Sequence, residues 1–187
     1  VLEDPQVGVV TKSKGSKVLE DLPEIQNLMA RAEATGRWIN LTNVRGRLPS
    51  DASRVADISV GIGISSAVTE AVAAGSRGVH CDLSPKRSHP FYHWGYEKVI
   101  FDDLERMMAA FKRYKADPAS EPELGDFSNR MEDVDSFQDG KAGERAGTYI
   151  RWLLEAFDEG KDRDGAMRLA NEKYAAVWGA DKVVFLE

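Results

Sequence analysis

Short β-rich runs alternate with helical patterns through the first half of the chain, and this alternation limits the folds that it can adopt. The β-rich runs lie at 7–11, 37–42, 57–61, 77–82 and 98–101. Strands that are joined through helices pair in parallel, with helices over both faces of the sheet. We therefore expect an α/β fold with a mostly parallel sheet of about five or six strands, flanked by helices.

The pattern changes after Pro118, where the chain becomes acidic and rich in turn-forming residues. The expected organisation has three parts: a domain over 1–116, a linker over 117–136 and extra C-terminal helices over 137–187. Apolar residues recur at helical spacing in the first of these helices and predict a face that packs in a core. They are Tyr149, Ile150, Leu153, Leu154 and Phe157.

Composition argues against several classes of function. The 187 residues carry a formal net charge of −6, so we expect no nucleic-acid partner. Cys81 is the only cysteine, which leaves no disulfide framework, and the three histidines are too scattered to suggest a zinc site. No apolar run approaches the roughly 18 residues that a membrane span needs. We expect a cytoplasmic setting and, because the sequence begins at Val1 rather than Met, a fragment of a longer protein.

A glycine turn separates the third β-rich run from the helix that follows it. Gly61 and Gly63 match two glycines of the dinucleotide-binding fingerprint, but Ser66 stands where the third would be. The turn also follows the third strand, whereas that fingerprint belongs to the first strand–helix turn of its fold. We therefore expect neither NAD nor another cofactor.

The same turn suits an anionic ligand such as a diphosphate. A strand that feeds a helix through residues 63–66 leaves backbone N–H groups at the helix start, beside the hydroxyls of Ser65 and Ser66. Glu70 lies about one turn further along, from where its carboxylate would accept two ribose hydroxyls. Two plainer interpretations stay open: Ser65 serves only as a helix N-cap, and Glu70 is a solvated acid that complements the helix dipole.

The segment from Ser65 to Gly75, SSAVTEAVAAG, resembles the nucleotide-binding segment of GT-B glycosyltransferases, whose pattern is (S/G)(S/G)xxxEAxxxG. In that family the segment follows a strand that begins Ala-Asp, as residues 56–57 do here. It precedes a strand that usually begins with Pro, where 77–78 reads Arg-Gly. The segment FQDGKAGER over 137–145 is similar to one in bacterial surface-polysaccharide members of the family.

The resemblance implies that residues 1–116 are the Rossmann-like, nucleotide-sugar-binding domain of a glycosyltransferase of cell-surface polysaccharide synthesis. Glu70 would bind the ribose, and five residues would hold the phosphates: Lys12, Lys14, Gly63, Ser65 and Ser66. The catalytic base would come from the N-terminal domain of a longer parent enzyme, so we expect the isolated chain to transfer no sugar. Peripheral membrane association of that parent enzyme is compatible with the resemblance. A nucleotide-sugar 2-epimerase-like domain and a non-catalytic binding domain of the same fold remain alternatives.

Two further loops follow predicted strands at the same edge of the sheet and carry candidate sugar or phosphate contacts. They hold Arg45 and Arg47 after the second strand, and Lys86, Arg87 and His89 after the fourth. Loops on a rigid scaffold often carry function. Exposed arginines on a loop, or a segment that only closes the sheet edge, would account for the same pattern.

Four acids lie close together in the second half of the chain: Asp133, Asp135, Asp139 and Glu144. Their oxygen atoms are of the kind that magnesium binds, but their spacing matches no calcium loop. We interpret them as helix caps and solvated acids, and predict no metal site.

Overall fold

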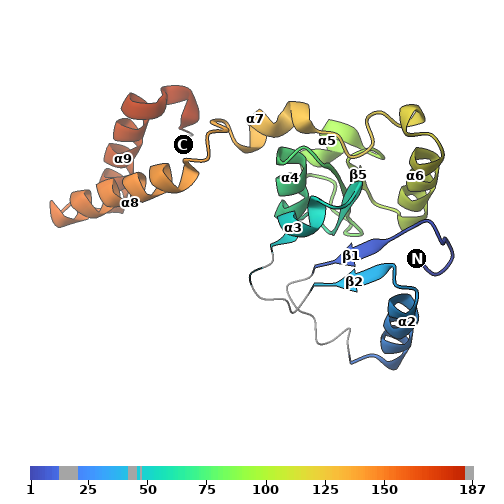
Figure 1. Cartoon of the computed structure of the whole chain (residues 1–187). Coiled ribbons are helices and arrows are strands. Elements are labelled where there is room, and N and C mark those ends of the chain that lie inside the picture. Colours follow the sequence, from blue (N-terminus) through green and yellow to red (C-terminus); the bar gives the residue numbers. More distant parts are fainter. Residues whose placement is uncertain (13–20, 42–45, 47, 184–187) are drawn as a thin grey trace. The chain divides into compact units, whose positions relative to one another are not determined.

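The computed structural model describes residues 1–12, 21–41, 46 and 48–183 (Figure 1). The chain forms two compact units, Val1–Asn129 and Arg130–Glu187.

The strands of the first unit pair in parallel, as expected for an α/β fold. β1 (Val9–Thr11) pairs with β2 (Trp38–Asn40) as a ribbon of its own, which Figure 1 shows. In the second sheet, β4 (Arg77–Cys81) lies between β3 (Ile58–Ile62) and β5 (Ile100–Phe101). In place of the single sheet of five or six strands that the sequence predicted, the described residues thus form a two-stranded and a three-stranded sheet. Strand patterns mark extended segments but leave open which edges pair, because pairing depends on contacts between distant residues.

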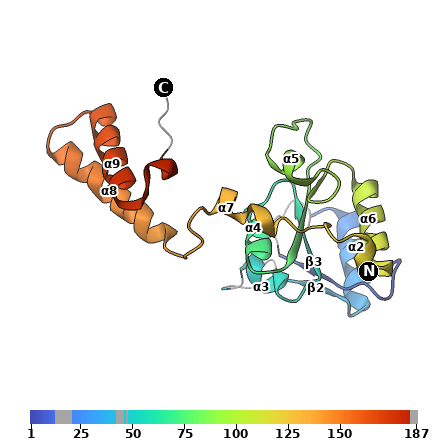
Figure 2. The same cartoon turned by 90° about the horizontal axis from the view of Figure 1, so that it is seen from above.

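The helices of the first unit alternate with these strands. They are α2 (Pro23–Ala34), α3 (Pro49–Ser53), α4 (Ser66–Ala73), α5 (Phe91–Gly95) and α6 (Leu104–Ala116), with 3₁₀ turns at Pro118–Ser120 and Ser128–Arg130. α4 and α6 lie on opposite sides of the three-stranded sheet in both views (Figure 1, Figure 2). The three-stranded sheet is therefore covered on both faces, whereas α2 buries none of its residues.

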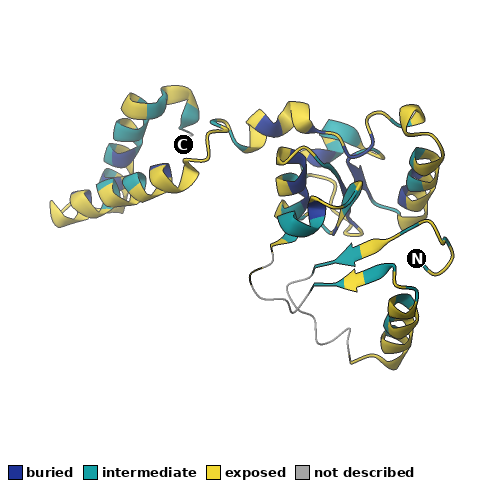
Figure 3. Cartoon of the chain, in the orientation of Figure 1, coloured by how far each residue is buried: buried dark blue, intermediate teal, exposed yellow. Residues whose placement is uncertain are grey.

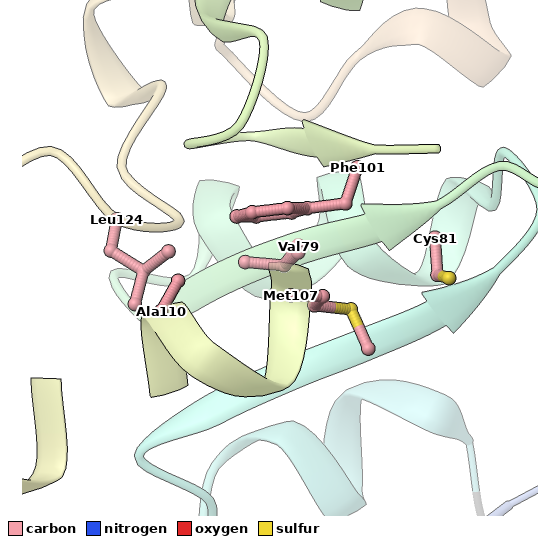
Figure 4. Packing of buried hydrophobic residues seen from close by; sticks show 6 residues of the cluster. All are labelled: Val79, Cys81, Phe101, Met107, Ala110 and Leu124. Atoms are coloured by element: carbon pink, nitrogen blue, oxygen red, sulfur yellow. The ribbon is translucent and has the colours of Figure 1, made fainter. Parts of the chain in front are cut away.

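The core of the unit lies between the three-stranded sheet and α6. Val79 of β4 and Phe101 of β5 pack against Met107 and Ala110 of α6, and Cys81 and Leu124 complete the cluster (Figure 4). Met107 and Ala110 are three residues apart, so they share one face of the helix. All six side chains are almost completely buried, so this cluster forms the apolar contact between the sheet and α6.

α4 packs closely on the opposite face of the sheet because Gly78 has no side chain. A Cβ atom at Gly78 would lie 2.6 Å from the Val68 side chain and 3.0 Å from the Val68 carbonyl oxygen. Val68, Ala71 and Val72 are the buried residues of α4. The glycine in β4 therefore sets how near the helix approaches the sheet.

The second unit contains a helical hairpin. Its elements are α7 (Met131–Val134), α8 (Ala142–Asp158), α9 (Arg163–Trp178) and a 3₁₀ turn at Ala180–Lys182. The Tyr149 hydroxyl of α8 donates to Asn171 Oδ1 of α9 at 2.8 Å, and the rings of Trp152 and Trp178 lie 5.5 Å apart. Lys173 of α9 also pairs with Glu155 of α8 at 3.5 Å. The hairpin is therefore held by aromatic side chains and by polar contacts between the two helices.

α8 does not bury the whole apolar face that its sequence predicts. Tyr149 and Trp152 lie toward α9, whereas Ile150, Leu154 and Phe157 are exposed. The apolar band of α8 extends around more of the helix than one neighbouring helix covers. The expectation that this face packs in a core is therefore only partly met within the described residues.

Candidate functional site

A left-handed glycine forms the turn at the carboxyl end of β3. Gly63 has φ +75°, a conformation that residues with a side chain rarely adopt. Its N–H donates to the Cys81 carbonyl at 2.7 Å, so the turn crosses to the carboxyl end of β4. This hydrogen bond places the glycine turn beside the residues that follow β4.

α4 begins immediately after this turn. Ser65 is the N-cap residue with extended backbone dihedrals, but its hydroxyl makes no capping hydrogen bond. Ser66, the first helical residue, is exposed. The first turn of a helix leaves backbone N–H groups without intrahelical partners, and these carry partial positive charge. Ser65 is therefore the N-cap residue of α4 by position, but its hydroxyl does not cap the helix in this structure.

His80 of β4 lies beneath the turn. Its Nδ1 accepts the Ser65 N–H at 3.3 Å, and its ring stacks on Phe91 with centroids 4.4 Å apart. Burial lowers the pKa of His80 to about 4, because a charged imidazolium would lose its hydration. Nε2 is buried and has no hydrogen-bond partner among the described residues. His80 is therefore neutral at physiological pH, with its proton on Nε2 as this hydrogen-bond arrangement requires.

Asp82 follows the last residue of β4 and is buried. Its carboxylate accepts the Ser84 N–H at 3.1 Å and the Tyr92 hydroxyl at 3.0 Å. Burial alone would raise the pKa of Asp82, but these hydrogen bonds and the nearby Arg87 charge lower it. Burial and the hydrogen bond to Asp82 raise the pKa of Tyr92 to about 12. Asp82 therefore acts as a charged anchor for the loop that follows β4.

Asp102 occupies the equivalent position after β5. Its Oδ2 accepts from Arg87 Nε at 3.0 Å and Nη2 at 2.7 Å, and its Oδ1 accepts from the Tyr96 hydroxyl at 2.8 Å. The Tyr96 hydrogen bond and the Arg87 contacts hold the pKa of Asp102 below its usual range. Arg87 is therefore held at the carboxyl end of β5 by Asp102 while its side chain stays exposed.

The structure brings together some of the residues that the sequence predicted for the site. Gly63, Ser65 and Ser66 form one turn, and Glu70 is exposed on α4. Lys12 follows β1, which belongs to the two-stranded sheet, whereas the glycine turn follows β3 of the three-stranded sheet. Lys14, Arg45 and Arg47 lie outside the described residues.

The loop after β4 places its candidate contacts differently. Lys86 is exposed, whereas His89 is partly buried and packs against Phe91 with ring centroids 4.5 Å apart. The aromatic residues of this loop therefore close the sheet edge in part, as the plainer interpretation holds. Lys86 and Arg87 are both exposed, and Arg87 also pairs with Asp102.

Sequence reasoning missed the supporting residues His80, Asp82, Tyr92 and Asp102. A signal was present for the two acids, because Asp82 ends the β-rich run 77–82, Asp102 follows the run 98–101, and carboxyl ends of parallel strands meet at one edge. His80 stands as a polar residue between the buried Val79 and Cys81. Its role depends on the Ser65 contact, which connects residues too far apart for periodicity to reveal.

Three of the four acids considered as metal ligands have other contacts. Asp139 makes two hydrogen bonds with the buried Arg145, at 2.9 and 2.7 Å, and these lower its pKa. Asp133 pairs with Arg130 at 2.7 Å, and Asp135 accepts backbone N–H groups of the following turn. The part of the chain that the structure describes contains no group of three or more His, Cys, Asp or Glu side chains placed to hold a metal ion. It also contains no helix that is long and apolar enough to cross a membrane.

A comparison of this chain with protein-family models, with curated proteins and with solved structures found no match. The function is therefore argued from the geometry of the site.

Proposed function

We propose that the first unit is the donor-binding, C-terminal domain of a glycosyltransferase that uses a nucleotide-activated sugar, in cell-surface polysaccharide synthesis. The observation that carries this proposal is the Gly63 turn, which delivers the start of α4 to the carboxyl edge of a parallel sheet. Ligands of open α/β sheets bind at this edge. In this proposal the two small sheets belong to one Rossmann-like domain.

The start of α4 offers the groups that a nucleoside diphosphate needs. Backbone N–H groups of the first turn and the hydroxyls of Ser65 and Ser66 would bind phosphate oxygens, which the helix dipole also favours. Ser66 and Glu70 are four residues apart, so they share a face of α4, about 6 Å apart along its axis. That spacing lets one ligand place a phosphate at Ser66 and the adjoining ribose at Glu70.

His80 supports this arrangement from inside the unit. Because its Nδ1 already accepts the Ser65 N–H, that amide points into the protein. The ligand would therefore meet the N–H groups that follow Ser65, together with the serine hydroxyls. Lys12 and Lys14 would add positive charge for the diphosphate, and Lys86 would contact the phosphate or sugar.

In this proposal the donor-binding domain would contribute to sugar transfer through electrostatic stabilisation. Donors at the helix start stabilise the negative charge that develops on the departing nucleoside diphosphate. The attacking hydroxyl needs a general base, which a second, N-terminal domain of a longer parent enzyme would supply. We therefore propose that this chain binds the donor but completes no transfer alone.

Calorimetry with a panel of UDP-, GDP-, ADP- and CMP-sugars tests the proposal on the 187-residue chain. We expect one donor to bind and Glu70→Gln to weaken its affinity by about 10- to 150-fold, the equivalent of about 1.5–3 kcal/mol for hydrogen bonds to a charged group. The matched control is Glu105→Gln, an exposed acid in the first turn of α6, which should leave affinity unchanged.

Other outcomes separate the alternatives. Equal affinity of the wild type and Glu70→Gln would remove Glu70 from the site. Turnover of the sugar nucleotide without an acceptor would favour the epimerase-like domain. Absence of binding to any donor of the panel would favour the non-catalytic domain, and multiple-turnover transfer by this chain alone would contradict the need for a second domain.

A further inference from the structure

The first unit has two strands with an open edge, that is, an edge that pairs with no other strand among the described residues. β1 pairs with β2 on one side only, and β3 pairs with β4 on one side only. An open edge presents a row of backbone N–H and C=O groups that can pair with another strand. Two open edges in one unit can therefore pair with each other.

The hydrogen bonds of each strand show which backbone groups face its open edge, because successive residues direct these groups to alternate sides. The Val9 N–H donates to the Arg37 carbonyl, just before β2, so the backbone groups of Val10 face the open edge of β1. The Gly63 N–H donates to the last residue of β4, so the backbone groups of Ile62 face the open edge of β3. Each edge therefore offers both a donor and an acceptor.

Apolar side chains beside the open edge of β3 lack cover on one face of the sheet. Val60 and Ile62 are 44% and 77% exposed. They share a face with Ile58, which packs against the core cluster beneath α6, because every second side chain of a strand points to the same face. α6 itself leaves Leu104 and Met108 exposed. Strands inside a parallel sheet are covered on both faces, so this face of β3 needs a further helix beside α6.

The handedness of the crossovers decides which strand of the ribbon would meet β3. If β1 lies next to β3, the chain steps from β1 to β2 in one direction and from β3 to β4 in the other. Right-handed crossovers then place α2 on the face opposite α4, which is the face of α6. If β2 lay next to β3, α2 would lie on the α4 face, and the α6 face beside β3 would stay uncovered.

The structure already places α2 and the start of the chain on the side of α6. Figure 1 and Figure 2 both show α2 and α6 on the same side of the unit, away from α4. Lys115 of α6 pairs with Asp4, ahead of β1, at 2.5 Å. These positions favour β1, and not β2, as the neighbour of β3.

We propose that the β1–β2 ribbon closes on β3 and forms one five-stranded parallel sheet in the order β2-β1-β3-β4-β5. In the register that aligns the carboxyl ends of the strands, Val10 lies opposite Gly61. The Val10 N–H then donates to the Val60 carbonyl, and the Ile62 N–H donates to the Val10 carbonyl. Closure covers the exposed face of β3 with α2, and it brings Lys12 beside the glycine turn, at the strand spacing of about 4.8 Å.

Hydrogen exchange followed by NMR measures closure on the full chain without any ligand, so its outcome is independent of the donor-binding proposal. Pairing slows the exchange of an amide that otherwise faces water. We expect the Ile62 amide of the wild type to exchange at least about tenfold more slowly than in Val10→Pro, which lacks the β1 donor and places a ring at the paired edge. Nuclear Overhauser contacts between protons of Val10 and Gly61 should confirm the register.

Val10→Ala is the matched control, because it shortens the same side chain but keeps the N–H group. Its Ile62 amide should exchange within a few-fold of the wild-type rate. Contacts between Val9 and Trp38 should persist in Val10→Pro, since proline is tolerated at an open edge and the lost donor faces away from β2. Circular dichroism checks that each variant keeps its helices.

Three results would each overturn the proposal. The first is an Ile62 amide that exchanges equally fast in the wild type and in Val10→Pro. The second is a wild type without contacts between Val10 and Gly61, or with contacts that join β2 to β3. The third is protection of Ile62 that rises with protein concentration, which would show that a second copy covers the open edge of β3.

Discussion

The strand–helix–strand segments β1–α2–β2 and β3–α4–β4 share the same parallel topology but differ sharply in burial. In β3–α4–β4, the helix buries three residues against the sheet, whereas α2 of β1–α2–β2 buries none (Figure 3). α2 carries charged side chains at Glu24, Arg31 and Glu33, while α4 carries only Glu70. The comparison teaches that alternation of strand and helix specifies topology, but that the side chains between the layers decide whether a unit has a core.

The largest expected difference is in how much stability is lost when an apolar side chain is truncated in each of the two sheets. Phe101→Ala in β5 should lower the free energy of unfolding of the first unit by about 3–5 kcal/mol, since it removes a large buried ring. Ile39→Ala in β2 should cost less than about 0.5 kcal/mol, because Ile39 is 54% exposed. Chemical denaturation followed by the NMR signals of the β4 amides measures both values. Equal losses of stability in the two variants would contradict the difference in burial between the two sheets.

The pH dependence of stability should reveal the buried histidine of β4. The pKa of His80 is about 4 in the folded chain against an ordinary value of 6.5, so as pH falls the unfolded chain binds the proton first. The stability of the fold that depends on a neutral His80 is therefore fully present above pH 6.5, and it is lost as pH falls toward 4. Because a difference of one in pKa corresponds to about 1.36 kcal/mol, the free energy of unfolding should fall by about 3 kcal/mol over this pH range.

Unfolding measured from pH 7 to pH 4 in the wild type and in His80→Asn checks this expectation. The variant should lose this part of the pH dependence. His93→Gln changes an exposed histidine of the same unit and should keep it. An unchanged profile in His80→Asn would show that His80 is not held neutral by burial.

The smallest expected effect comes from a comparison of one glycine from each of the two strand–helix–strand segments. Gly78→Ala should cost about 1–3 kcal/mol, because its Cβ would lie 2.6 Å from the Val68 side chain. Gly8→Ala, next to β1, should be close to neutral, since the nearest atom to its Cβ would be the Arg37 carbonyl oxygen at 3.5 Å. The same denaturation experiment measures both variants, and a neutral Gly78→Ala would mean that α4 can move away from the sheet at little cost.

Much of the local structure was predictable from the sequence. The expected C-terminal helices correspond to α8 and α9, and the expected turn lies at Gly63 with the helix beginning at Ser66. These features depend on short-range sterics and on the spacing of apolar residues, both of which a single sequence displays. The supports of the candidate site were less predictable, because the Ser65–His80 contact joins two separate elements.

The sequence by itself determined the α/β class, the parallel pairing of strands and the place where a helix starts beside a glycine turn. Only the tertiary structure decided that the strands form two sheets, that Asp102 binds Arg87, and that Ile150, Leu154 and Phe157 of α8 are exposed. The physical reason is the range of the interactions. Backbone conformation responds to neighbours along the chain, whereas burial and charge pairing depend on which distant segments meet in space.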